Sequence, residues 1–118
     1  MKRYQLLIDG EWREPISKQW KPNINPANTD DVIGEFASAG ADDAKAAVEA
    51  AKRAFPGWRS TPMVKRGEIL FKAANLLEQR LEEVAQAMTR EEGKTLPEAR
   101  GETARGVAAV RGRRSRRG

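Results

Sequence analysis

Residues 40–58, which read GADDAKAAVEAAKRAFPGW, constrain the fold more than any other stretch. Their apolar side chains recur at the spacing of one face of an α-helix, with charged side chains opposite. The apolar positions are Ala44, Ala47, Val48, Ala51, Ala54 and Phe55. Gly40 can cap the helix, and Pro56-Gly57 is predicted to end it. Because alanines dominate the face, we expect this helix to lie close against a neighbouring element.

A β-hairpin is predicted before this helix, in residues 4–13, YQLLIDGEWR. Asp9-Gly10 can adopt the left-handed backbone angles of a two-residue turn, and β-compatible residues flank it on both sides. Leu6 and Ile8 would then share one face of the first strand. Trp12 lies in the second strand and is expected to pack, because a lone aromatic residue in a hairpin is usually buried against a neighbour.

The segment between the hairpin and the helix combines a loop with a short strand. Residues 15–26 contain turn formers and are predicted as irregular structure, with Trp20 and Ile24 as apolar contacts. Residues 32–36, VIGEF, alternate weakly between apolar and other side chains, which predicts a short strand.

Three more helices are predicted after residue 60. Thr61-Pro62 has the features of a helix start, with Thr61 as cap, and the helical pattern then runs to about Arg80. The apolar face expected for this helix is Ile69, Leu70, Ala73, Leu76 and Leu77. A third helix repeats the helical spacing from Leu81 until Gly93, which fits a helix stop.

The last helix is predicted from the capping-box spacing of Thr95-x-x-Glu98 and extends to about Val110. The chain is therefore predicted as α+β and mostly helical, with an N-terminal hairpin and a short strand followed by four helices. No strand falls between consecutive helices, so the doubly wound parallel sheet of a nucleotide-binding domain is not predicted.

The composition excludes several chemistries. The 118 residues contain no cysteine and no histidine, so the chain has no disulfide, no thiolate and no imidazole base. The apolar run near the N-terminus is only Leu6-Leu7-Ile8, far short of a signal-peptide core or a membrane span. We therefore expect no membrane association and a cytoplasmic location.

The net charge of +5 comes from the last eight residues, RGRRSRRG, which hold five arginines. Without these arginines, 17 basic residues balance 17 acidic ones. An arginine tail can bind phosphate groups by counterion release, which keeps open the alternative of a small nucleic-acid-binding protein. No aromatic residue lies among these arginines to stack on bases, so we expect weak, non-specific binding of polyanions.

Several segments, in order, resemble the N-terminal part of the NAD(P)-dependent aldehyde dehydrogenase family. The matching stretches are IDGEW at 8–12, INPAN at 24–28, VIGE at 32–35, AVEAAKRAFPGWRSTP at 47–62, and ILFKAANLLEQRLEEVAQAMTREEGKTLPEARGE at 69–102. The resemblance implies that residues 1–110 are a partial piece of the larger α/β aldehyde dehydrogenase fold.

The resemblance also implies what the chain lacks. In the family, the nucleophilic cysteine, the glutamate base, the oxyanion asparagine and the residues that bind NAD or NADP all follow this segment. We therefore expect no catalytic residue and no cofactor in this chain alone, although the full-length family uses NAD or NADP and forms homo-oligomers. The predicted function is that of a fragment of an enzyme that oxidises an aldehyde to a carboxylic acid.

One family site carries over in part, a site for a monovalent cation. The resemblance places a main-chain carbonyl ligand at Ile24, beside Asn23, and a carboxylate ligand at Glu91. Oxygen ligands suit a hard cation, and the third protein ligand would lie outside this chain. The family more often has aspartate where this chain has Glu91, and a plain solvated carboxylate at the end of a helix is the alternative.

The end of the chain departs from the family pattern. After ARGETARG the resemblance predicts a continuing helix with an aromatic pair, whereas this sequence reads VAAVRGRRSRRG. We hypothesise that the chain is truncated or frameshifted after about Val110, with residues 111–118 as a disordered Arg/Gly-rich tail. The nucleotide sequence downstream of codon 110 would test this. A third interpretation is a regulatory partner that docks on intact subunits.

Overall fold

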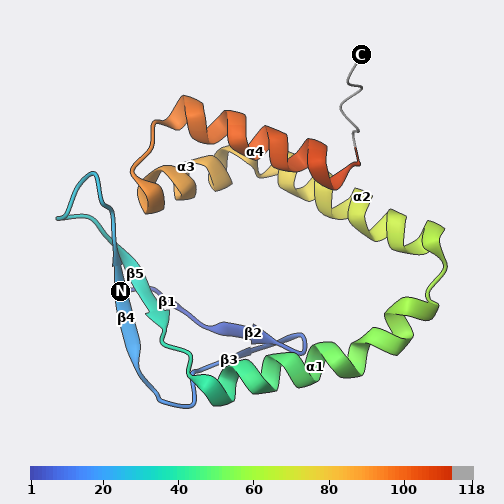
Figure 1. Ribbon diagram of the computed structural model, residues 1–118. Helices are drawn as coiled ribbons and strands as arrows, with labels where there is room; N and C mark the ends of the chain where they lie inside the picture. Colours follow the sequence, from blue (N-terminus) through green and yellow to red (C-terminus); the bar gives the residue numbers. More distant parts are fainter. Residues whose placement is uncertain (113–118) are drawn as a thin grey trace. The chain divides into compact units, whose positions relative to one another are not determined.

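The computed structural model describes residues 1–112, and the chain divides into two compact units, Met1–Ser60 and Thr61–Gly118. The first, the N-terminal unit, contains β1 (Arg3–Tyr4), β2 (Leu6–Ile8), β3 (Glu11–Arg13), β4 (Trp20–Ile24), β5 (Val32–Ala37) and α1 (Ala41–Ser60) (Figure 1). The second, the helical unit, contains α2 (Met63–Gln79), α3 (Leu81–Glu92) and α4 (Leu96–Val110). The predicted α+β, mostly helical class with four helices is confirmed.

The predicted hairpin forms from β2 and β3, which pair in antiparallel register from Leu6 opposite Arg13 to Ile8 opposite Glu11. Asp9 and Gly10 both have positive φ angles, 56° and 75°, as a two-residue hairpin turn requires. Trp12 does not pack as expected and is 67% exposed. All three residues of β3 are exposed, so among residues 1–112 Trp12 has no neighbour that buries it.

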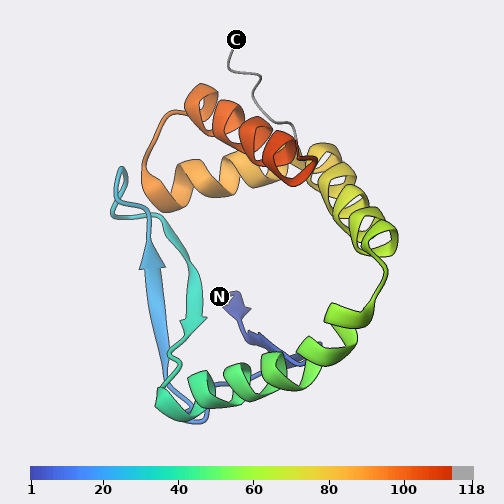
Figure 2. The ribbon, with the colours of Figure 1, turned by 45° about the vertical axis from the view of Figure 1, so that its right-hand side comes forward.

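A three-stranded sheet in the order β1-β5-β4 was only partly predicted. The strand at 32–36 is confirmed as β5 and extends to Ala37, but β4 replaces part of the expected loop. Pro22 lies inside β4, which is tolerated because β4 is an edge strand of this sheet. β4 and β5 run side by side in antiparallel directions (Figure 2).

The short strand β1 pairs in parallel with β5, and aromatic and ionic contacts hold it there. The rings of Tyr4 and Phe36 stack with centroids 4.5 Å apart, and the Arg3 guanidinium contacts the Glu35 carboxylate at 2.8 Å. A Cβ atom on Gly34 would lie 2.7 Å from the Tyr4 ring and 2.8 Å from the Lys2 carbonyl oxygen. Glycine at this position is therefore what lets β1 approach β5 so closely.

Helix α1 begins as predicted, because the Ala44 N–H donates to the Gly40 carbonyl over 3.1 Å. It does not end at Phe55, however, but continues through Pro56 to Ser60. Proline removes only the hydrogen bond of its own nitrogen, so the residues after it can still donate to carbonyls one turn earlier. The helix changes direction toward this end in Figures 1 and 2, as a proline inside a helix causes.

The predicted alanine face of α1 remains exposed in this chain. Val48 and Phe55 are 64% and 58% exposed, whereas Ala50, which lies off the predicted face, is buried. Ala47, Ala50, Ala51 and Ala54 line an open groove of about 390 Å³ with Leu7 and Ile8 of β2. The expected close neighbour is therefore only partly present among residues 1–60.

The helical unit follows the predicted boundaries closely. α2 begins one residue later than expected, with Pro62 rather than Thr61 at the capping position and no side-chain cap. Gly93 adopts the left-handed conformation after α3, with φ of 74°, and the capping box of Thr95 and Glu98 forms at the start of α4. These three boundaries depend on local residue types, which is why the sequence locates them well.

Alanines form the interior of the helical unit. Ala74 of α2, Ala85 of α3 and Ala99 of α4 are completely buried, and Val107 is 4% exposed. The Thr103 hydroxyl is buried as well and donates to the Ala99 carbonyl over 2.9 Å. Most of the face predicted for α2 is exposed instead, including Ile69 and Leu76, whereas Leu77 lies beside Gly106 of α4 and is half-buried.

Arg111, the first residue of the predicted tail, has a defined place at the end of α4. Arg111 caps the C-terminus of α4, and its guanidinium donates to the Glu78 carboxylate at 2.6 Å and to the Asn75 side-chain oxygen at 2.7 Å. This pairing holds the pKa of Arg111 above its usual range. Residues 113–118, the rest of the predicted tail, lie outside the described residues. In the described part of the chain, none of the helices is long and apolar enough to cross a membrane.

Candidate functional site

The first predicted cation ligand, Ile24, lies at the end of β4, where the register of β4 against β5 shifts between Asn23 and Ile24. The loop that follows is organised by Asn25. Its side-chain oxygen accepts from the Ala27 N–H at 2.9 Å, and its side-chain amide donates to the Asp31 carboxylate at 3.1 Å. The backbone at Ile24 is thus held between a paired strand and an ordered loop.

The second predicted ligand, Glu91, is exposed in the last turn of α3. Ile24 belongs to the N-terminal unit and Glu91 to the helical unit, and the cation site that would join them remains a prediction. A carbonyl and a carboxylate are oxygen donors that suit a hard monovalent ion. Within residues 1–112, the side chains of His, Cys, Asp and Glu do not gather into any group of three that could hold a metal ion.

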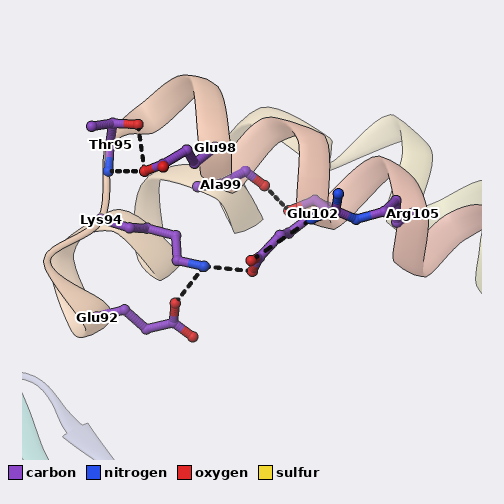
Figure 3. Close-up of polar contacts among 8 residues, drawn as sticks. Glu92, Lys94, Thr95, Glu98, Ala99, Glu102 and Arg105 are labelled. Atoms are coloured by element: carbon purple, nitrogen blue, oxygen red, sulfur yellow. Dashed lines mark hydrogen bonds and ion pairs between the residues drawn. The ribbon is translucent and has the colours of Figure 1, made fainter.

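Next to Glu91, the turn between α3 and α4 carries a cluster of charged side chains centred on Lys94 (Figure 3). The Lys94 ammonium contacts Glu92 at 2.9 Å and Glu102 at 2.6 Å. The hydrogen bonds that Lys94 donates to Glu102 and Glu92, the one to Glu102 first, raise the pKa of Lys94 above its ordinary value. Because two carboxylates already neutralise this ammonium, the cluster braces the turn and does not offer a free positive charge to a ligand.

The start of α4 is stabilised by Glu98. Its carboxylate accepts from the Thr95 N–H at 3.1 Å and from the Thr95 hydroxyl at 2.7 Å. These hydrogen bonds, the hydroxyl's first, lower the pKa of Glu98 below its usual value. The N-terminal end of α4 is therefore already occupied by a negative charge from its own helix.

A buried carboxylate performs the same task at α1. Asp43 is 5% exposed, and its two oxygens accept from the Gly40 N–H at 2.9 Å and from the Ile16 N–H at 3.2 Å. It closes the first turn of α1 and ties the loop before β4 to that helix. A dinucleotide pyrophosphate binds at free helix N-termini. The ends of α1 and α4 do not fit one, because Asp43 and Glu98 fill them.

Asp43, Lys94 and Arg111 anchor neighbouring segments, a role that was not predicted from the sequence. For Asp43 a local signal exists, since an acidic residue three positions after a capping residue can accept its N–H. Lys94 with Glu102 and Arg111 with Glu78 are brought together by helix packing, so no local pattern marks them. These residues support the fold.

A comparison with known protein families identifies the chain. Residues 12–113 match the model of the aldehyde dehydrogenase family, so the chain belongs to this family. It is 46% identical over 108 residues to the alpha-ketoglutaric semialdehyde dehydrogenase of Bacillus subtilis, which covers 92% of this chain and 22% of that protein. It is 41% identical over 100 residues to the NADP(+) succinate-semialdehyde dehydrogenase of Escherichia coli, covering 85% of this chain and 20% of that protein.

Solved structures agree with this assignment. The NAD-dependent aldehyde dehydrogenase of Sinorhizobium meliloti superposes with a TM-score of 0.89 at 33% identity, covering 93% of this chain and 22% of that one. An NADP-dependent enzyme of Escherichia coli superposes with a TM-score of 0.88 at 38% identity, covering 92% and 22%. The chain therefore spans about a fifth of the length of the relatives it matches.

Proposed function

We propose that this chain is the N-terminal scaffold segment of an NAD(P)-dependent aldehyde dehydrogenase subunit and has no turnover by itself. The observation that carries the proposal is the family match over residues 12–113, together with the close superposition on about a fifth of complete subunits. The thiolate that attacks the aldehyde, and the groups that bind NAD or NADP, would come from the rest of the subunit.

The relatives suggest the substrate class of the complete subunit. Their names specify semialdehydes of short dicarboxylic acids, including alpha-ketoglutaric, methylmalonic and succinic semialdehyde. We extend this class to the parent of the present segment, as oxidation of an aldehyde that carries a carboxylate. We also retain the cytoplasm as its location and a homo-oligomer as its assembly, which fractionation and sedimentation of the complete subunit would check.

A chimera tests the proposal. Residues 1–112 replace the aligned segment of the Bacillus subtilis relative, and reduction of NAD or NADP is followed with alpha-ketoglutaric semialdehyde as substrate. We expect the chimera to turn over the aldehyde, whereas the 118-residue chain and the relative without its N-terminal segment do not. Turnover by the purified chain, with host enzymes excluded, would overturn the proposal, as would a chimera no more active than the truncated relative.

The cation site enters the same proposal through Ile24 and Glu91. In the chimera, Glu91→Gln keeps the side-chain shape and removes the charge that would attract the ion. We expect K⁺ or Na⁺ to raise the melting temperature of the parent chimera and to have a smaller effect on the variant. Equal effects of the salt on both proteins would support the plain solvated carboxylate.

The nucleic-acid alternative rests on the arginines of residues 111–118, and one of the five is already engaged. Arg111 pairs with Glu78 and Asn75, so binding would depend on the other four. Deleting residues 113–118 tests it directly. Loss of nucleic-acid retention at physiological salt would favour the alternative, whereas unchanged retention would dispose of it.

A further inference from the structure

The turn of the β2–β3 hairpin has a chemically reactive sequence. Asp9-Gly10 is the one place in the chain where aspartate precedes glycine, and no asparagine precedes glycine anywhere. A glycine nitrogen is the least hindered backbone nucleophile, because the adjacent Cα carries no side chain. The space around Gly10 is open as well, since a Cβ built there would meet nothing within 4 Å. The Gly10 nitrogen can therefore approach the Asp9 side chain without a clash.

Both reacting groups are accessible at this turn. The Asp9 carboxylate contacts the Arg53 guanidinium at 3.4 Å, but the two side chains are 56% and 63% exposed, so this ion pair holds the carboxylate only weakly. The last strand pair of the hairpin is Ile8 opposite Glu11, which leaves the Gly10 N–H beyond the end of the ladder. The carboxylate and the nitrogen are thus both exposed to solvent and lie next to each other in the chain.

The conformation of the turn restrains their reaction. Closing a succinimide ring between the Gly10 nitrogen and the Asp9 side chain requires rotation about the Asp9 Cα–C bond. Asp9 is held in the left-handed conformation of the turn, with φ of 56°, so the strands must separate there first. Among residues 1–112, β2 and β3 pair only with each other, and a two-stranded hairpin is only marginally stable. Opening of this turn is therefore a local event of low cost.

Ile8 is the side chain that opposes this opening. Among the strand residues of the hairpin it alone is buried, at 8% exposed, and it lies with Ala50 in the wall of the groove beside α1. Its neighbour Leu7 is 58% exposed. Burial of Ile8 therefore sets how often the turn opens, and Leu7 contributes less.

We propose that Asp9 is a site of spontaneous isoaspartate formation, gated by opening of the β2–β3 hairpin. The Gly10 nitrogen attacks Cγ of the protonated Asp9 carboxyl, and the carboxyl hydroxyl leaves with the amide proton as water. Water then opens the succinimide. Attack at Cγ restores aspartate, whereas attack at the main-chain carbonyl carbon breaks its bond to the Gly10 nitrogen. In the second product the chain runs through Cβ and Cγ, and the former main-chain carbonyl carbon becomes a free carboxylate.

The modification should remove the hairpin. Isoaspartate lengthens the main chain of the turn by one carbon atom. The two-residue turn depends on positive φ angles at both Asp9 and Gly10, 56° and 75°, and the longer link does not keep this geometry. The register of Ile8 opposite Glu11 would then be lost, and the Ile8 side chain would leave the groove beside α1.

Peptide mapping of the full 118-residue chain tests the proposal. After incubation at neutral pH and physiological temperature, trypsin releases residues 4–13, YQLLIDGEWR, in which Asp9 is the single aspartate. We expect a second form of this peptide with unchanged mass and altered retention, which accepts a methyl group from an isoaspartate-specific methyltransferase. Residues 19–45 are the internal control, because they hold the other four aspartates and none of these precedes glycine. This control peptide should show no second form of unchanged mass.

Two substitutions test the gate. Ile8→Ala should speed isoaspartate formation by up to about tenfold, because truncating a buried isoleucine costs more than the 1.4 kcal/mol that corresponds to tenfold. The rate of the parent chain unfolded in guanidinium is the ceiling. Leu7→Ala is the matched control and should leave the rate nearly unchanged. Circular dichroism checks that both variants keep their helices, and if Ile8→Ala does not, the folded and unfolded parent chains are compared instead.

Gly10→Ala separates the chemistry from the loosening of the hairpin. Alanine is strained at φ of 75°, so this substitution opens the turn, but its methyl group hinders the nitrogen that must attack. Isoaspartate should therefore decrease, whereas it increases in Ile8→Ala.

The proposal would be overturned by the absence of a second form of residues 4–13, or by equal amounts of isoaspartate in residues 19–45. Formation at the same rate in the folded and the unfolded chain would reject the gating by the hairpin.

Discussion

The N-terminal unit is held mainly by backbone pairing, whereas the helical unit is held by side chains packed around three alanines. In the N-terminal unit, five short strands and one buried carboxylate, Asp43, fix the chain, and few apolar side chains are buried. In the helical unit, Ala74, Ala85 and Ala99 are fully buried and ion pairs surround them. A substitution should therefore lower stability mainly by disturbing backbone geometry in the N-terminal unit, and mainly by changing side-chain volume in the helical unit.

Enlarging the alanine interior should have the largest effect. Ala85→Leu adds three carbon atoms at a position with no exposed surface, and overpacking of this kind typically costs about 1–3 kcal/mol. Ala47→Leu makes the same change on the open groove beside α1 and should alter stability by less than about 0.5 kcal/mol. Urea unfolding followed by circular dichroism measures both, and equal costs would show that the helical unit is not closely packed.

The next effect is expected from Gly34→Ala in the N-terminal unit. The new Cβ would lie within 2.8 Å of a backbone oxygen, so β1 must move away from β5, at a cost of about 1–3 kcal/mol. Amide exchange should quicken in residues 3–4 and 35–36. Gly101→Ala is the control, because its Cβ meets nothing within 4 Å and α4 should gain about 1 kcal/mol from alanine. Unchanged exchange in β1 would contradict the tight approach.

Removing the buried carboxylate should cost somewhat less. Asp43→Ala leaves the N–H groups of Gly40 and Ile16 without their acceptor, and such a loss costs about 1–2 kcal/mol. Asp42→Ala changes the neighbouring residue in the same helical turn, but its side chain is exposed, so the loss should be below about 0.5 kcal/mol. If the two variants melt alike, Asp43 contributes only its charge near the helix end.

Acid should loosen the helical unit slightly. Hydrogen bonds from Arg100 to Glu82 and from Thr95 to Glu98 lower the pKa of both carboxyls in the helical unit, and a hydrogen bond from Lys18 lowers the pKa of Glu14 in the N-terminal unit. A lowered pKa stabilises the folded state above the unfolded value, and this contribution disappears as the pH falls through the folded pKa.

Hydrogen exchange of residues 61–112 and 1–60 at neutral pH and below pH 4.5 measures this acid response. Glu98→Gln keeps an oxygen acceptor that does not titrate, so the acid response of the helical unit should become smaller. An acid response of the helical unit that is the same in Glu98→Gln as in the parent chain would mean that Glu98 does not control it.

The sequence predicted those features that depend on a few adjacent residues. The Asp9-Gly10 turn, the Gly93 stop and the Thr95 capping box all formed, because each follows from local backbone preferences. β1 and β4 were missed, since β1 needs a partner about 30 residues away and Pro22 argues against a strand unless that strand is at an edge.

The direction of helix faces was harder to predict. The apolar residues of α1 and of the first half of α2 lie in helices, as predicted, but most of them are exposed in the described part of the chain. The helical spacing shows which apolar side chains share one face of a helix. It does not show whether another element of the chain packs on that face. For the cation site, Ile24 and Glu91 came from the family resemblance, because neither residue has a local pattern that indicates a ligand.

The alanine interior restricts substitution from two sides. At positions 74, 85 and 99 a larger side chain would push neighbouring helices apart, while glycine would weaken each helix by about 1 kcal/mol. The methyl group of alanine is therefore the side chain that suits all three positions. Sequence drift in this unit should spare these three codons even though none of them takes part in any chemistry.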